Sequence, residues 1–92
     1  MSEILKLQSW KTYNIYSVTP VKTKFGKTYI LKDNNFNKYW ANNKVTQYLN
    51  NRPNLHNTEL SKKILFTIRT GDEKYFKDKD GYEVKFIETD IY

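Results

Sequence analysis

A β-hairpin is predicted by the stretch Val21-Lys22-Thr23-Lys24-Phe25-Gly26-Lys27-Thr28-Tyr29-Ile30-Leu31. β-Forming residues flank a turn, Thr23 to Gly26, in which Gly26 is free to take a positive φ. Lysines alternate with aromatic rings in this stretch, and more aromatic residues surround it: Trp10, Tyr13, Tyr16, Tyr39 and Trp40. Cations suit phosphates and ring faces suit unstacked bases, so the pattern is typical of single-stranded nucleic-acid binding.

Working outward, the flanking residues predict a small sheet followed by a short helix. A first strand is expected over Trp10–Val21, with Pro20 at a bulge or an edge, and a third over Lys38–Ala41. Val45, Tyr48 and Leu49 then follow the helical period, and Asn42 or Asn43 can cap the start of that helix.

The last third of the chain returns to the strand pattern. Lys62–Thr70 predicts a fourth strand, continued after a bend by Lys74-Tyr75-Phe76, and Asp80-Gly81 is a strong hairpin signal. In the final strand Tyr82, Val84 and Phe86 alternate with more polar residues. We expect the rings of Phe66, Phe86 and Tyr82 to lie in the core.

The order of five strands with one helix between the third and the fourth predicts a mainly β fold, a small five-stranded OB-like barrel. The stretch Tyr13–Leu31, with its turn Thr23-Lys24-Phe25-Gly26, resembles short basic OB-type proteins of viruses and mobile elements that bind single-stranded DNA. The resemblance implies a role in DNA replication. An SH3-like small barrel is the alternative fold.

In an OB-fold the ligand face is centred on strands two and three and flanked by two hairpin loops. On this chain that face would use Tyr29 or Ile30 and Tyr39 or Trp40; strand parity lets one of each pair face the ligand, and we favour Trp40 over Tyr39. The complete set of expected nucleic-acid contacts is Lys22, Lys24, Phe25, Lys27, Tyr29, Tyr39, Trp40, Arg69, Lys74 and Tyr75.

Size and charge set the wider limits. The 92 residues suffice for one domain, expected to span residues 1–92, and carry a net charge of +6. Residues 1–71 hold twelve basic and three acidic side chains, whereas residues 72–92 hold four basic and seven acidic ones. A basic body suits a polyanion. Without cysteines, a membrane span or a secretory segment, we expect a soluble intracellular protein, in the cytoplasm or nucleus of a host cell, with no membrane partner.

Catalytic signals are weak. His56 is the single histidine and has no cysteine to activate, and Asp78-Lys79-Asp80-Gly81 lacks the spacing of a calcium loop. We therefore expect no catalytic residue, no metal and no cofactor.

Three function classes stay open at this stage. The favoured one is non-enzymatic binding of single-stranded DNA, with RNA as a second ligand and with self-association or a replication-protein partner as open questions. The second is a protein-binding module that docks a host or replication protein through its aromatic and basic surface. The third, a small nuclease, would need clustered carboxylates.

Overall fold

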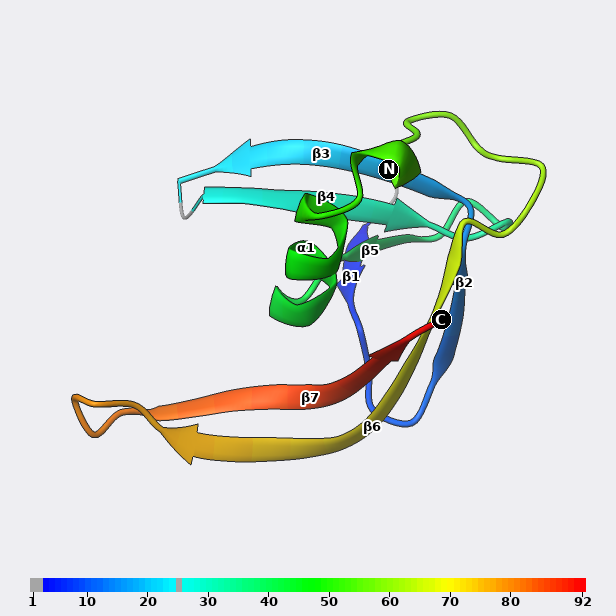
Figure 1. The fold of residues 1–92 in the computed structure, drawn as a ribbon. Helices are drawn as coiled ribbons and strands as arrows, with labels where there is room; N and C mark the ends of the chain where they lie inside the picture. Colours follow the sequence, from blue (N-terminus) through cyan, green and yellow to red (C-terminus); the bar gives the residue numbers. More distant parts are fainter. Residues whose placement is uncertain (1–2, 25) are drawn as a thin grey trace.

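The structure is a computed structural model that describes residues 3–24 and 26–92. It is mainly β, with two sheets arranged around one helix (Figure 1). The strands are β1 (Ile4–Lys6), β2 (Thr12–Ile15), β3 (Ser17–Thr23), β4 (Gly26–Lys32), β5 (Lys38–Trp40), β6 (Phe66–Lys77) and β7 (Glu83–Ile91). The helix α1 (Asn43–Asn50) and the single turn η1 (Pro53–Leu55) lie between β5 and β6.

The first sheet has the order β1-β5-β4-β3 and the second β2-β6-β7. β3 and β4 form the predicted antiparallel hairpin, with Gly26 at φ 116°. Pro20 lies in β3, at the edge of the first sheet, where a missing N–H costs no ladder hydrogen bond. The prediction of an edge position is confirmed.

The predicted first strand is divided at Tyr16. Ile15 pairs with Phe66 in the second sheet, whereas Ser17 pairs with Lys32 in the first, so the chain changes sheet at this residue. Together with β1, which runs parallel to β5, this division gives seven strands over the described residues. The prediction of a small, mainly β domain is confirmed, but the two sheets are not closed into a barrel, and the specific five-stranded OB-like barrel is not what they form.

The core lies between the two sheets and α1. Asn42, one of the two predicted candidates, caps the helix, because its Oδ1 accepts the N–H of Val45 at 3.0 Å. Val45 and Leu49 point inward from the helix. The buried apolar side chains are Leu7, Tyr13, Ile15, Val18, Tyr29, Leu31, Val45, Leu49, Phe66 and Ile68.

The β6–β7 hairpin extends beyond this core. We call residues 72–88 the arm; it begins where the ladder shifts register between Thr70 and Glu73. Figure 1 shows the arm and the β3–β4 hairpin as two projections on the same side of the molecule. The radius of gyration is 13.6 Å, against about 12 Å for a compact domain of this length.

Two of the three predicted core aromatics lie on or beside the arm and are exposed. Phe86 is 42% exposed and Tyr82 72%, whereas Phe66 is buried as predicted. Alternation along β7 does give two faces, but from Glu83 to Glu88, before the strand reaches Thr89, no side chain on either face is buried by the described residues. The placement of Phe86 and Tyr82 in the core is wrong for that reason.

Candidate nucleic-acid interface

The first sheet has a buried face and a half-exposed face, set by strand alternation. Tyr29 and Leu31 of β4 are fully buried, so Ile30 between them points to the other side. Ile30 stands opposite Trp40 of β5, and Trp40 stands opposite Lys6 of β1. We call Lys6, Ile30, Lys32, Lys38 and Trp40 the outer face.

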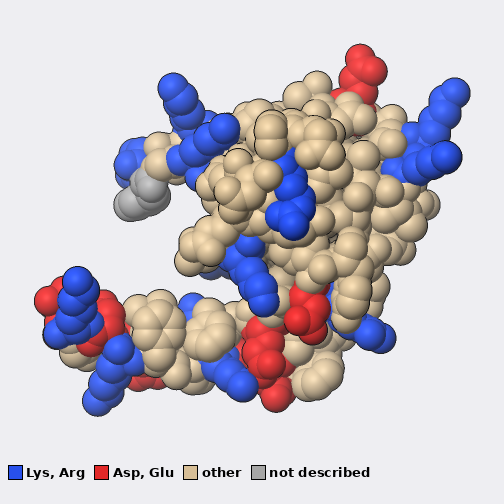
Figure 2. Space-filling model, in the orientation of Figure 1, with Lys and Arg blue, Asp and Glu red and all other residues tan. Residues whose placement is uncertain are grey.

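Every charged residue in the four strands of this sheet is a lysine: Lys6, Lys22, Lys27, Lys32 and Lys38. Lys32 lies opposite Lys38, and Lys22 lies opposite Lys27 near the end of the β3–β4 hairpin. Lysines facing each other across strands repel, so an anion placed between them is favoured. In Figure 2 several basic side chains gather on this hairpin, the upper of the two projections.

The predicted contact Tyr29 is part of the core. Its side chain is 0% exposed, and its hydroxyl donates to Asn50 Oδ1 at 2.6 Å. The Lys27 ammonium lies 5.6 Å from the ring centroid. A ring enclosed in this way cannot stack on a base, so the assignment of Tyr29 to the ligand face is wrong. Ile30, the alternative to Tyr29, lies on the outer face.

Tyr39 also lies on the inner side of the sheet, opposite to Trp40 as expected. Its ring makes an edge contact with Tyr13, with centroids 4.8 Å apart, and its hydroxyl donates to Asp33 Oδ2 at 3.3 Å. Burial and the neighbouring Asp33 carboxylate raise the pKa of Tyr39 above its ordinary value of 10.0. The structure therefore gives Tyr39 a packing role and leaves Trp40 on the outer face.

The predicted contacts at the arm are not joined to the lysines of the first sheet. The Lys74 ammonium lies 2.9 Å from Glu88 Oε1, and this pairing raises the pKa of Lys74. Tyr75 is exposed, with the Lys85 ammonium 6.0 Å from its ring, and Lys85 is itself paired with Glu73.

The remaining predicted contacts fall elsewhere. Arg69 lies in β6 of the second sheet, opposite Thr12 and Asp90, and is exposed. Phe25 lies outside the described residues. The hairpin lysines Lys22, Lys24 and Lys27 are exposed, so of the predicted set these three and Trp40 belong to the first sheet's accessible surface.

A groove of about 1210 Å³ separates the body from the arm, and Figure 2 shows the hollow between the two projections. Its body wall carries Lys6, Trp40 and Lys44 and one carboxylate, Asp90. Its arm wall carries Phe76 and Phe86, whose ring centroids are 5.7 Å apart, together with Glu73, Lys85, Ile87 and Glu88. The body wall therefore has two lysines and one carboxylate, and the arm wall has an apolar ring pair with two carboxylates and one lysine. Both of those arm carboxylates are in ion pairs, Glu73 with Lys85 and Glu88 with Lys74.

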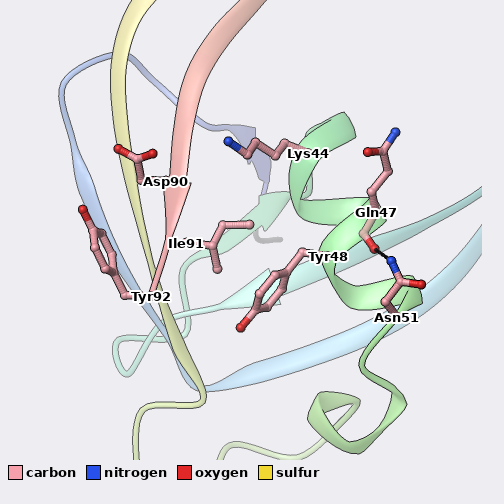
Figure 3. Close-up of a pocket in the computed structure, with 7 residues that line it drawn as sticks. All are labelled: Lys44, Gln47, Tyr48, Asn51, Asp90, Ile91 and Tyr92. Atoms are coloured by element: carbon pink, nitrogen blue, oxygen red, sulfur yellow. Dashed lines mark hydrogen bonds between the residues drawn. The ribbon is translucent and has the colours of Figure 1, made fainter.

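A smaller hollow of about 570 Å³ lies between α1 and the end of β7 (Figure 3). Figure 3 shows Lys44 and Asp90 near one end of the hollow, and the Tyr48 and Tyr92 rings beside it. The Asn51 side-chain amide donates a hydrogen bond to the backbone carbonyl of Gln47. The Arg52 guanidinium lies 4.0 Å from the Tyr48 ring centroid and adds a positive charge beside the hollow.

Comparison of the chain with protein-family models, with curated proteins and with solved structures finds no match. Function must therefore be argued from the surfaces just described. Over residues 3–24 and 26–92, no three His, Cys, Asp or Glu side chains are arranged to hold a metal ion. In the same part of the chain, no helix combines the length and the apolar character that crossing a membrane requires.

Three outer-face lysines were missed by sequence reasoning. Lys6 could not be predicted, because its strand, β1, is only three residues long and pairs with β5, which is far away in the sequence. So short a strand leaves no alternating pattern in the sequence. Lys32 and Lys38 could have been found, since each is two positions from an outer-face apolar residue, Ile30 or Trp40.

Proposed function

We propose that this protein binds single-stranded nucleic acid, without catalysis, across the outer face of its first sheet and along the β3–β4 hairpin. DNA is the favoured ligand, and replication of a virus or mobile element the favoured setting, because of the resemblance to short basic OB-type proteins. The bent β2–β3 segment, which pairs with β6 on one side of Tyr16 and β4 on the other, supports an open OB-like arrangement.

The observation that carries the proposal is the charge of the first sheet: five lysines and no carboxylate in its strands. Phosphates would lie along Lys6, Lys32 and Lys38 on the outer face. Strand alternation places Lys22 and Lys27 on the other face, near the end of the β3–β4 hairpin, where they would meet phosphates of a strand that turns round that end. Trp40 and Ile30, side by side on the outer face, would provide an apolar platform for bases. Stacking one base on an aromatic ring contributes about 1–3 kcal/mol without selecting sequence.

Salt dependence gives the direct test. Fluorescence anisotropy of labelled oligo-dT would be measured from low to physiological salt, because each lysine that meets a phosphate adds about −0.7 to the slope of log K against log salt. The triple variant Lys6→Gln/Lys32→Gln/Lys38→Gln should flatten this slope by about 2 units.

A matched control removes the same charge elsewhere. Lys11→Gln/Lys77→Gln/Lys79→Gln changes one exposed lysine just before β2 and two near the tip of the arm. We expect this control to keep the slope of the unaltered protein. Absence of binding at low salt, or equal flattening in both triple variants, would rule out the outer face as the site.

Tryptophan fluorescence tests the stacking platform separately. The chain has two tryptophans, and Trp10 is exposed on a different part of the chain, where its Nε1 donates to Asp72. In a Trp10→Phe variant, oligo-dT should quench the emission of Trp40. Unchanged emission at saturating oligo-dT would exclude contact between bases and Trp40.

A further inference from the structure

The arm presents apolar surface that nothing in the described structure covers. Phe76 is 52% exposed and Phe86 42%, although the two rings touch each other. Tyr75, on the opposite face of the same ribbon, is 58% exposed. Clustered exposed aromatics on a small protein mark a surface that meets a partner.

The backbone of the arm is equally unsupported. β2 pairs with β6 only as far as Arg69, so from Glu73 to Lys77 the ribbon consists of β6 and β7 alone. A two-stranded ribbon is marginally stable in water unless a further strand or another surface packs on it. Both of its long edges also carry unpaired backbone groups.

Charge indicates what covers the arm. Residues 72–88 hold six carboxylates and four lysines, whereas the rest of the chain holds twelve basic and four acidic side chains. Within the groove the body wall holds Lys6, Lys44 and Asp90, a net charge of +1, and the arm wall holds Glu73, Glu88 and Lys85, a net charge of −1, beside the Phe76 and Phe86 rings. The arm is thus complementary in charge to the body of an identical molecule.

We infer that two copies of this chain associate by exchanging arms, each arm entering the groove of the other copy between α1 and that copy's own arm. In this arrangement Phe76 and Phe86 of one copy face the same residues of the second, because these rings line the groove of each. The outward side of each arm, with Glu83, meets Lys44 and Gln47 on α1. Such an interface is two-fold symmetric and closes at the dimer.

Sedimentation velocity without nucleic acid tests the association on the whole chain. We expect a concentration-dependent dimer, and Phe76→Ser/Phe86→Ser should raise its dissociation constant at least tenfold. Phe36→Ser is the matched control, since Phe36 is an exposed ring on the loop between β4 and β5. Because Phe76 and Phe86 lie outside the core, their replacement should leave the far-ultraviolet circular dichroism unchanged.

Cross-linking tests the exchange itself. The chain has no cysteine, so Gln47→Cys and Lys77→Cys can be made separately, mixed and oxidised. A disulfide-linked heterodimer is expected from this mixture and not from Lys77→Cys mixed with Asn34→Cys, a position on the β4–β5 loop. A monomer at 100 μM (roughly 1 mg/ml), a dimer insensitive to Phe76→Ser/Phe86→Ser, or equal cross-linking in both mixtures would overturn the inference. The arm of the second copy would cover Lys6 and Trp40, which line the groove, so arm and nucleic acid compete for these two residues. All of these outcomes are measured without nucleic acid and do not depend on its binding.

Discussion

Replacement of Tyr29 separates a core role from a ligand role. The side chain points from β4 toward α1 and is fully buried. Its hydroxyl donates to Asn50, a residue that is itself exposed. Tyr29→Ala removes a whole buried ring, which costs about 3–5 kcal/mol. Tyr29→Phe removes only the hydrogen bond, and because Asn50 can turn to water the cost should stay near 0.5–1 kcal/mol.

Urea unfolding followed by circular dichroism measures both values. With a slope of about 1–3 kcal/mol per molar urea, Tyr29→Ala should lower the midpoint by more than about 1 M. Tyr75→Ala is the control, because Tyr75 is exposed on the arm and its loss should change stability by no more than about 0.5 kcal/mol.

Binding completes the test of Tyr29. Tyr29→Phe should hold oligo-dT as tightly as the unaltered protein, within twofold, because an enclosed ring meets no base. Two results would refute the reasoning: a Tyr29→Ala variant as stable as Tyr75→Ala, or a Tyr29→Phe variant that folds normally and binds oligo-dT tenfold more weakly.

Three further predictions concern stability. The pKa of Tyr39 in the folded state lies above 10.0, so the protonated Tyr39 contributes its full share to the free energy of unfolding below pH 10 and loses it as pH rises through the folded-state pKa. Urea midpoints should therefore fall above pH 10 in the unaltered protein, and they should fall less steeply in Tyr39→Phe. Asn42→Ala should cost about 1–2 kcal/mol in urea unfolding, since the side chain caps α1 and also donates to Thr89 Oγ1 at 2.9 Å, whereas Asn54→Ala should cost less than about 0.5. Thr70→Val should cost about 1–3 kcal/mol by the same measurement, because the buried Thr70 hydroxyl accepts the Lys11 N–H and donates to the Gln8 carbonyl. A loss below about 0.5 kcal/mol, the lower limit for one hydrogen bond, would contradict the assigned contacts.

The locally encoded parts of the fold could be predicted from sequence. Three features depend only on residues close by in the sequence: the cap Asn42, the helical spacing from Val45 to Leu49 and the hairpin turn at Gly26. Gly81 at φ 83° ends the β6–β7 connection in the same way. Local backbone preferences are enough to determine these features, without contacts to residues far away in the sequence.

The misplaced residues depend on which neighbour covers them. Alternation shows that Tyr29 and Ile30 face opposite sides, yet only the position of α1 makes the Tyr29 side the inner one. Phe86 alternates as regularly as a core residue, but its strand continues past the body. The bend at Tyr16 lies inside an unbroken run of β-formers, so it follows from two competing pairings, with Phe66 and with Lys32.

The separation of charge along the chain links the two proposals. Bodies with eight more basic than acidic side chains repel one another when neighbouring molecules crowd on one strand of nucleic acid. That repulsion acts within a Debye length of about 8 Å at physiological salt, which is the range of direct packing. An acidic arm placed between two bodies replaces part of the repulsion with attraction. The arm therefore lowers the cost of close packing. It covers Lys6 and Trp40 in the groove and leaves the lysines of the β3–β4 hairpin, on the other projection, available to phosphates.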